Sequence, residues 1–365
     1  MDEVVGRLLA DLPGPDADAA LAVRERAARA LRPAGALERL DELAAWLAGW
    51  QRSTRPVVRH PAALVFVGDH GVAARGVSAY PQSTTAAMLN ALRAGAATAS
   101  AMASAAGARL VVVDAGVGRP TRDITIEPAL SPGRFMECFE LGRDAVASLD
   151  ADAGRARPDR ITDAGRARPD RRTDAGRARP DRTDVVVVGE MGIANTTAAA
   201  AVCAALFGLR TEDWVGVGTG VDERGYARKV AAAEAARNHV DAAAGPLEVL
   251  RRVGGAELVA IAGAVLEARL RSIPVLLDGF VVGAAVAPLE RVRAGALDHC
   301  EAGHCSSEPG HRLVLDKLAK APLLDLGLRL GEASGALAAL PLLRLAAAAA
   351  TEVATFDEWG LPRAP

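Results

Sequence analysis

A glutamate between glycines is the residue of this chain best placed to do chemistry. Glu190 lies in the segment Gly189–Thr197, which follows the apolar run Val185–Val188 and precedes an alanine-rich stretch. This order predicts a buried strand, a tight turn and the start of a helix, where free N–H groups and the helix dipole favour an anion such as phosphate. Because a carboxylate repels phosphate, we expect Glu190 to face a hydroxyl, an N–H or a cationic ring. The alternative is a solvated glutamate in an ordinary strand-to-helix turn.

A second glutamate beside a glycine, Glu332, lies in the segment Leu328–Ala336 between helical stretches. We expect Glu332 and Glu190 to converge on one site, although they are far apart in the sequence. Two carboxylates can divide a reaction between them, one taking a proton and the other orienting the substrate. The alternative is that Glu332 only favours a helix N-terminus through the dipole.

Other loops after predicted strands offer groups for substrate binding. Glycines alternate in the Gly216–Gly220 loop, which leaves its backbone open to a ligand, and Lys229 follows on the next helix. The spacing is not the G-x-G-x-x-G fingerprint of dinucleotide binding. Asp278 suits a ribose hydroxyl and a helix cap equally well. Asp69 is expected to cap backbone groups, and His70 to be structural.

The segment His299–Arg312 contains three histidines and two cysteines, a composition that raises the question of zinc. Its spacing matches neither C-x-x-C pairs nor H-E-x-x-H, so we expect no metal. The chain has four irregularly spaced cysteines, which we expect to be free thiols in a reducing cytoplasm: Cys138, Cys203, Cys300 and Cys305.

Composition excludes several functions. The net charge is −2 and aromatic residues make up 3% of the chain, so neither charge nor stacking favours nucleic acid as a partner. The acidic N-terminus does not resemble a signal peptide. The apolar stretch Leu345–Ala350 is too short to cross a bilayer. We therefore expect a cytoplasmic protein without a membrane partner.

Short apolar runs alternate with longer helical stretches, a pattern typical of an α/β protein with a Rossmann-like parallel sheet and helices on both faces. Ligands in such folds bind at the carboxyl ends of strands. We predict an α/β nucleotide-binding domain over residues 61–327 and a small helical domain formed by residues 1–60 with 328–365. The predicted strands are Ala63–Val67, Leu110–Val113, Val185–Val188, Trp214–Val217 and Val275–Leu277. The main predicted helices are Thr84–Ala106 and Glu223–Ala244.

An eleven-residue repeat interrupts the α/β pattern, with units that begin at Asp152, Asp163 and Asp174. Each unit contains glycine and proline and almost no large apolar residue, so it lacks the seam of a coiled coil. Its arginines suggest RNA binding, but the interleaved aspartates and missing aromatics favour a solvated segment. We predict a disordered surface insertion over residues 150–184.

Taken in order, these motifs resemble one known family. They are G-D-H-G-V with G-V-S-A-Y-P-Q, G-E-M-G-I-A-N-T-T, G-T-G-V-D, L-D-G-F, E-P-G-H-R and L-R-L-G-E-A-S-G, between about Leu64 and Trp359. The set is similar to the nicotinate-nucleotide–dimethylbenzimidazole phosphoribosyltransferases of cobalamin lower-ligand synthesis. The chain departs from the pattern in the repeat and at Ala194, where the family usually has glycine. That alanine is tolerable if its φ is negative.

The resemblance implies that nicotinate mononucleotide and 5,6-dimethylbenzimidazole react to give α-ribazole 5′-phosphate and nicotinate. It implies that Glu332 is the general base and Glu190 a second site carboxylate, in a homodimer that needs no cofactor or metal. The remaining candidates divide between phosphate or ribose (Gly192, Asn195, Thr196, Gly218, Thr219, Gly220, Lys229, Asp278 and Ser306) and the aromatic base (Tyr80, Pro81, Met88, Arg329 and Leu330).

Two other functions compete with this interpretation. A non-catalytic nucleotide sensor could use the same phosphate-binding turn, but it would not need both Glu190 and Glu332. A dinucleotide-dependent dehydrogenase is disfavoured because the glycine fingerprint fails and no acid stands at the expected ribose position.

Overall fold

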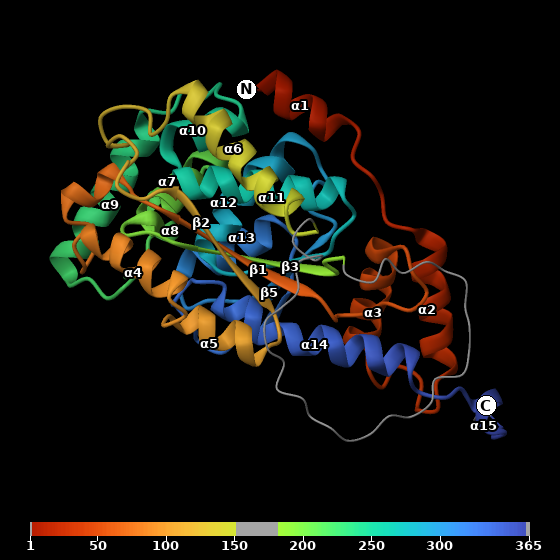
Figure 1. Ribbon diagram of the computed structural model, residues 1–365. Coiled ribbons are helices and arrows are strands. Elements are labelled where there is room, and N and C mark those ends of the chain that lie inside the picture. Colours follow the sequence, from red (N-terminus) through yellow and green to blue (C-terminus); the bar gives the residue numbers. More distant parts are fainter. Residues whose placement is uncertain (1, 151–181, 363–365) are drawn as a thin grey trace.

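A six-stranded, wholly parallel sheet forms the centre of the molecule, in the order β2-β1-β3-β4-β5-β6. The computed structural model describes residues 2–150 and 182–362 (Figure 1). The strands are β1 (Pro61–Gly68), β2 (Arg109–Gly116), β3 (Val185–Met191), β4 (Val275–Leu277), β5 (Cys300–His304) and β6 (Pro322–Leu324). The predicted fold class, with helices on both faces of a parallel sheet, is confirmed.

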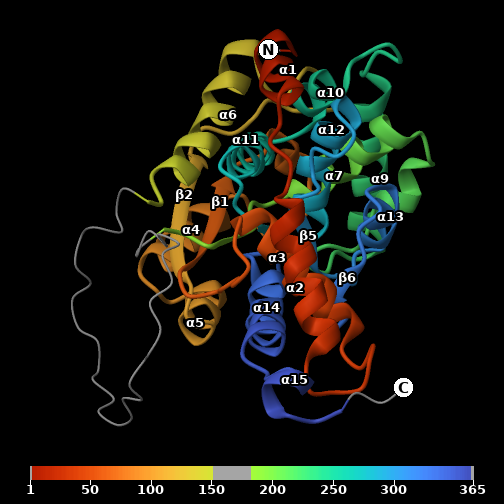
Figure 2. The same cartoon turned by 90° about the vertical axis from the view of Figure 1, so that its right-hand side faces the viewer.

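Helices cover both faces of this sheet (Figures 1 and 2). The apolar side chains of β1 alternate between two cores, because successive side chains of a strand point to opposite faces. Leu64 and Phe66 join the larger core, beneath α6, α7, α11 and α12, and Ala63 and Val65 join the second core, with α3, α5 and α14.

The helices of the larger core are α1 (Asp2–Ala10), α6 (Pro132–Ala147), α7 (Asn195–Phe207), α8 (Thr211–Trp214), α9 (Glu223–Asn238), α10 (Pro246–Val253), α11 (Ala256–Leu270), α12 (Phe280–Val292) and α13 (Pro309–Lys317). Those of the second core are α2 (Ala17–Arg29), α3 (Glu38–Gln51), α4 (Ser83–Arg93), α5 (Thr98–Ala105) and α14 (Ser334–Thr351). The 3₁₀ turn η1 (Gly71–Arg75) and the short helix α15 (Phe356–Trp359) complete the described elements.

The strand order places a topological switch point between β1 and β3. The chain moves outward from β1 to β2 and then returns to the other side of β1 as β3. Ligands of open α/β sheets bind beyond the carboxyl ends of the strands at such a point. The segments there are Gly68–His70 after β1 and Glu190–Gly192 at the end of β3, so the topology brings the first candidate glutamate to the expected position.

The predicted strand Trp214–Val217 is wrong. Trp214 ends α8, and the residues after it form a loop. Trp214 and Val215 are apolar because both are buried, and Trp214 stacks on Phe207 with ring centroids 5.7 Å apart, whereas Val217 is exposed. Strands β5 and β6 were not predicted, since β5 (Cys-Glu-Ala-Gly-His) has no β-branched residue and β6 is short.

The helical N-terminal and C-terminal segments are present as expected, but they share a core with the sheet. Helices α2, α3 and α14 pack together, and their buried residues belong to the same cluster as Val65 and Val187 of the sheet. Helix α1 instead contacts α12 on the other face. The division into a helical domain (1–60 with 328–365) and an α/β domain (61–327) stays a prediction.

Helix α14 is apolar and, at 18 residues, long enough to cross a membrane by length and composition alone. The stretch Leu345–Ala350 is therefore part of a longer apolar helix than the sequence suggested. Over half of α14 is buried, and it packs on α3, α5 and β5, so the protein core accounts for its composition.

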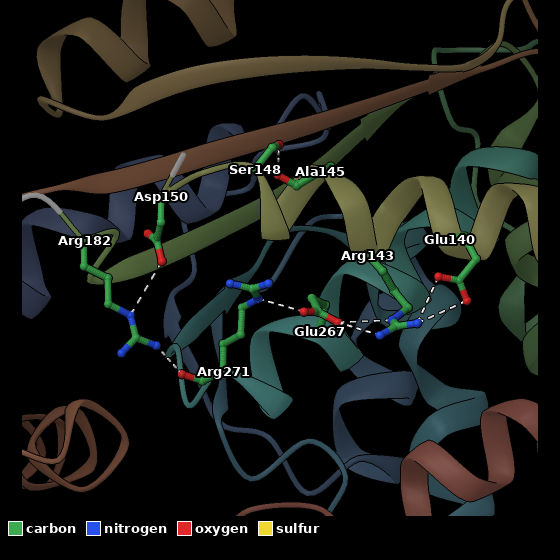
Figure 3. A network of polar contacts seen from close by, with 8 residues as sticks. All are labelled: Glu140, Arg143, Ala145, Ser148, Asp150, Arg182, Glu267 and Arg271. Carbon is green, nitrogen blue, oxygen red and sulfur yellow. Dashed lines mark hydrogen bonds and ion pairs between the residues drawn. The ribbon is translucent and has the colours of Figure 1, made fainter. Parts of the chain in front are cut away.

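The repeat lies outside the described residues, but the chain on either side of it meets at one point (Figure 3). Thr183 N donates to Asp150 Oδ1 at 3.0 Å, and Arg182 Nε lies 3.8 Å from Asp150 Oδ2. The Arg182 guanidinium also donates to the carbonyl of Arg271. These contacts close the base of the predicted insertion just before β3.

Candidate active site

Glu190 is buried at the carboxyl end of β3, with 7% of its surface exposed. The Nδ2 group of Asn195, the first residue of α7, donates to Glu190 Oε2. Gly331, in the loop before α14, packs against this carboxyl group. A Cβ there would lie 2.6 Å from Glu190 Oε1, so only glycine lets the loop approach this closely. The turn thus holds the carboxyl group in one place rather than leaving it solvated.

Glu332 lies in a left-handed turn directly beside Glu190. Three consecutive residues have positive φ: Gly331 at 81°, Glu332 at 57° and Ala333 at 62°. Glu332 N donates to the carbonyl of Glu190 at 2.9 Å, so the structure brings the two glutamates together. A left-handed conformation costs an L-residue roughly 1–2 kcal/mol, and such strain gathers at functional sites.

One oxygen of buried Glu332 is hydrogen-bonded, and the other is unpaired in the described part of the chain. Oε2 accepts the backbone N–H of Ala99, in the first turn of α5, at 3.3 Å. Among the residues that the structure describes, Oε1 has no hydrogen-bond partner. An unpaired oxygen leaves this carboxylate able to accept a proton. Burial makes it a stronger base because it disfavours the anion, whereas the N–H of Ala99 at the α5 N-terminus acts in the opposite direction.

Asp278 follows β4 and caps α14 from outside the helix. Its Oδ1 accepts the N–H groups of Gly335 at 2.8 Å and Ala336 at 3.0 Å, and His304 Nε2 lies 3.4 Å away. Its Oδ2 is buried without a partner in the described structure. Capping therefore accounts for one oxygen, and the ribose role stays a prediction for the other.

Burial and neighbouring acids raise the pKa of both glutamates. Burial, Asp278, Glu257 and Glu332 together raise the pKa of Glu190 to about 8, against the hydrogen bond from Asn195. Burial, and after it Asp278, raises the pKa of Glu332, while the Ala99 N–H lowers it. Carboxyl groups gathered in this way favour a positive charge among them.

Lys229 reaches back from α9 to the glycine loop, as its position suggested. Its Nζ donates to the carbonyl of Gly216 at 2.7 Å and to Thr196 Oγ1 at 3.1 Å. Burial lowers the pKa of this lysine, and the charge of Glu308 opposes that effect. Glu308 in turn accepts the N–H of Gly218 at 2.9 Å. The ammonium group thus joins the α7 N-terminus to the loop before α9.

The loop itself is open to solvent beyond this junction. Gly218 has a φ of 54° and Gly220 a φ of 104°, conformations that favour glycine. Thr219 and Gly220 are exposed, whereas Gly218 is buried against Lys229.

At the start of α7, Thr196 and Gly192 are half-buried. Ala194 precedes the helix with a φ of +74°, so the condition of a negative φ, under which alanine would be tolerated at this departure from the family pattern, is not met. The position retains the left-handed conformation that glycine adopts most easily.

Ser306 lies in the loop after β5 and is held by His311. Its N–H donates to His311 Nδ1 at 2.8 Å, and its hydroxyl lies 3.0 Å from the same nitrogen. Burial and the neighbouring His304 lower the pKa of His311 to about 3, so this imidazole is neutral at pH 7.

The residues predicted for the aromatic base lie in two exposed segments. Tyr80 and Pro81 precede α4 and are exposed, while Met88 on that helix is half-buried against the second core. Arg329 and Leu330 are exposed in the loop before Glu332.

Asp69 and His70 behave as expected. Asp69 Oδ2 accepts the N–H of Gly118 at 2.7 Å. His70 is fully buried and pairs with Glu257, whose importance the sequence analysis missed. The sequence feature that could have identified Glu257 is that it is the only acid in the apolar run Ala256–Ala260. Glu308 was also missed, although the motif E-P-G-H-R contains it.

The histidines of the segment His299–Arg312 serve other contacts. His299 Nε2 donates to the carbonyl of Val265 at 3.0 Å, while His311 holds Ser306. Within residues 2–150 and 182–362, no group of three or more His, Cys, Asp or Glu side chains could hold a metal ion.

Comparisons with known proteins agree with this geometry. The sequence model of the phosphoribosyltransferase family matches residues 12–155 and 172–361. A nicotinate-nucleotide–dimethylbenzimidazole phosphoribosyltransferase of Novosphingobium aromaticivorans is 45% identical over 351 residues, which cover 96% of this chain and 94% of the relative. That of Agrobacterium fabrum is 42% identical over 97% of this chain and 93% of its own. The chain belongs to this family.

A solved structure extends the comparison to the fold. The crystal structure of CobT from Thermus thermophilus has a TM-score of 0.84 and 38% sequence identity, and the match covers 95% of this chain and all of that one. The recognition of the phosphoribosyltransferase family from its motifs is confirmed. The family model leaves residues 156–171 unmatched, and these lie within the repeat.

Proposed function

We propose that this phosphoribosyltransferase moves the phosphoribosyl group of nicotinate mononucleotide to 5,6-dimethylbenzimidazole. The products are α-ribazole 5′-phosphate and nicotinate, in the synthesis of the cobalamin lower ligand. The observation that carries the proposal is the pairing of Glu332 with Glu190 at the switch point, with Lys229 at the adjacent helix N-terminus.

The acid cluster suits the cationic half of the nucleotide. The nicotinate ring of the substrate is a pyridinium, so its positive charge gains from Glu190, Glu332 and Asp278, which repel one another without it. The same negative charge stabilises a ribose carbon with oxocarbenium-like character. The phosphate would bind at the N-terminus of α7 beside Lys229 and the Gly218–Gly220 loop.

The reaction needs one proton acceptor. A benzimidazole nitrogen attacks C1′ of the ribose, the bond from C1′ to the pyridinium nitrogen breaks, and nicotinate leaves with the bonding electrons. Glu332 accepts the ring proton that the benzimidazole loses, through its Oε1. Attack from the side opposite the leaving group inverts the β-nucleotide to an α-product.

Product analysis tests the function directly. Purified protein should release nicotinate from nicotinate mononucleotide only when dimethylbenzimidazole is present, and NMR should show the α-anomer. Glu332→Gln should lower kcat by roughly a hundredfold or more, the usual contribution of a general base, while nucleotide affinity persists. A sensor would bind the nucleotide without releasing nicotinate, and near-normal turnover of the variant would remove Glu332 from the mechanism.

We also propose that the enzyme is a cytoplasmic homodimer that needs no metal or organic cofactor. The family resemblance supports the dimer. The four cysteines are free, as expected of a reducing compartment.

A further inference from the structure

A buried acid–base pair to which the proposed mechanism assigns no role packs against the turn of the candidate site. His70 follows β1, and Glu257 lies in the first turn of α11. Both side chains are fully buried, and His70 Nε2 lies 2.5 Å from Glu257 Oε1. Burying such groups is costly unless they are paired, and Glu257 Oε2 and His70 Nδ1 have no hydrogen-bond partner in the described structure.

Three glycines make room for the pair under the catalytic turn. A Cβ on Gly68 would lie 2.5 Å from Glu257 Oε2, and one on Gly255 would lie 2.4 Å from His70 Cε1. A Cβ on Gly192, which closes the turn that begins at Glu190, would lie 3.3 Å from Glu257 Oε1 and 2.7 Å from the carbonyl of Gly68. The pair is thus packed between β1 and the turn.

Charged and polar groups face Glu190 from several elements. Asp278 lies at the end of β4, Glu332 before α14 and Asn195 on α7, while Glu257 acts from α11 below the turn. Among these, Asp278 and Glu332 are the ones proposed to meet the substrate, whereas Glu257 is fully buried and packs against Gly192 of the turn. The charge of Glu257 helps to raise the pKa of Glu190.

We infer that Glu257, held by His70, is a positioning residue of the transfer reaction, which acts through the turn Gly189–Gly192 to fix the place and the protonation of Glu190. This inference rests on the proposed function only for the identity of the reaction. The contact between the pair and the turn is independent of it.

Charge substitutions within the pair test the inference. Glu257→Gln keeps the shape of the side chain but removes its negative charge, so the pKa of Glu190 should fall by roughly one unit. The midpoint of the Glu190 titration can be followed by its carboxyl infrared band, which is assigned by its loss in Glu190→Gln. The pH dependence of kcat/KM provides a second measurement of the same midpoint. His70→Gln keeps a hydrogen-bond donor and leaves the charge of Glu257 in place. The Glu190 midpoint in this variant should therefore stay at or above that of the unchanged protein.

A second glutamate on α11 provides the matched control. Glu267 pairs with Arg143 and Arg271 ten residues further along the helix (Figure 3), so Glu267→Gln should leave the Glu190 midpoint unchanged. An unshifted midpoint in folded Glu257→Gln, or equal shifts in Glu257→Gln and His70→Gln, would overturn the inference. The infrared band needs no turnover, whereas failure of the proposed function would appear as absent nicotinate release in the unchanged protein.

Discussion

At the scale of single residues, the site gathers acidic side chains that a bound positive charge would stabilise. Glu190 has a pKa of about 8 because burial and three neighbouring carboxyl groups disfavour its anion, so it is protonated at pH 7 in the free protein. A bound pyridinium would reverse part of that effect. With the nicotinate ring beside Glu190, as proposed above, binding of the nucleotide would be linked to proton release, and departure of nicotinate would remove the positive charge that favoured it.

Lys229 should discriminate between the two substrates. Lys229→Met keeps most of the buried volume but removes the charge, so it should weaken nicotinate mononucleotide binding by about ten- to a hundredfold, the cost of one charge-assisted contact. Dimethylbenzimidazole, which has no phosphate, should bind with nearly unchanged affinity. Calorimetric titration of the variant with each substrate measures both values.

The neighbouring cation is the control for Lys229. Arg228 is exposed, and its Nε donates to the carbonyl of Gly76 rather than to the glycine loop. Arg228→Met should therefore bind both substrates normally. Equal nucleotide affinity in the Lys229 and Arg228 variants would place the phosphate elsewhere.

Site residues that stand close to glycines in the sequence were predicted, and Glu257, which was judged by its apolar helix, was missed. Glu190 and Glu332 stand beside glycines, and that local signal was enough to single them out. Glu257 lies at the start of an apolar helix, where a single acidic residue is normally interpreted as solvent-exposed. Its role depends on which helix covers β1, and this is set by packing across distant parts of the chain.

At the level of elements, two helices begin in the same way on either side of the site. Gly192-Ile193-Ala194 precedes α7, which begins at Asn195, and Gly331-Glu332-Ala333 precedes α14, which begins at Ser334. In both, an alanine with positive φ is followed by the first helical residue. The shared geometry brings both helix N-termini close to the end of β3, where Asp278 caps α14 and, among the described residues, no side chain caps α7.

The positive φ of Ala194 predicts that replacing this alanine of the turn before α7 with glycine changes the free energy of unfolding little. In Ala194→Gly, relief of left-handed strain should offset the lost methyl group and the added chain entropy, leaving the free energy of unfolding within about 1 kcal/mol of the original. Ala198→Gly, in the buried interior of α7, should lose about 1–2 kcal/mol, because it gains no such relief. Urea unfolding compares the two, and equal losses would contradict the strain at Ala194.

Element prediction succeeded where a strand is long and branched, and failed where tertiary contacts decide. Four consecutive valines specify β3. Strand β5 forms because Gly303 lets it pack against α14, where a Cβ would lie 2.6 Å from Ala336 Cα. Trp214 and Val215 are apolar because they fill the core beside α7, and no local pattern separates that from a strand.

At the level of the whole molecule, the insertion is attached to the fold at a closed base. Asp150 accepts the N–H of Thr183 and lies beside Arg182, so the chain before the repeat and the chain after it already meet without it. The base lies at the start of β3, whereas the candidate site lies at its carboxyl end. An insertion placed there need not disturb the chemistry.

Replacing residues 151–181 with a short Gly/Ser linker should therefore preserve both fold and activity. Because loop-closure entropy changes by only about 0.6 kcal/mol for each halving of length, the shorter loop should leave stability equal or slightly higher. Nicotinate release should stay within about twofold. Adding Asp150→Ala to the shortened chain should lower its melting temperature, since it removes the acceptor that closes the base. A shortened chain with Asp150 intact that melts well below the full-length protein, or loses turnover, would mean that the repeat packs against the fold or takes part in the reaction.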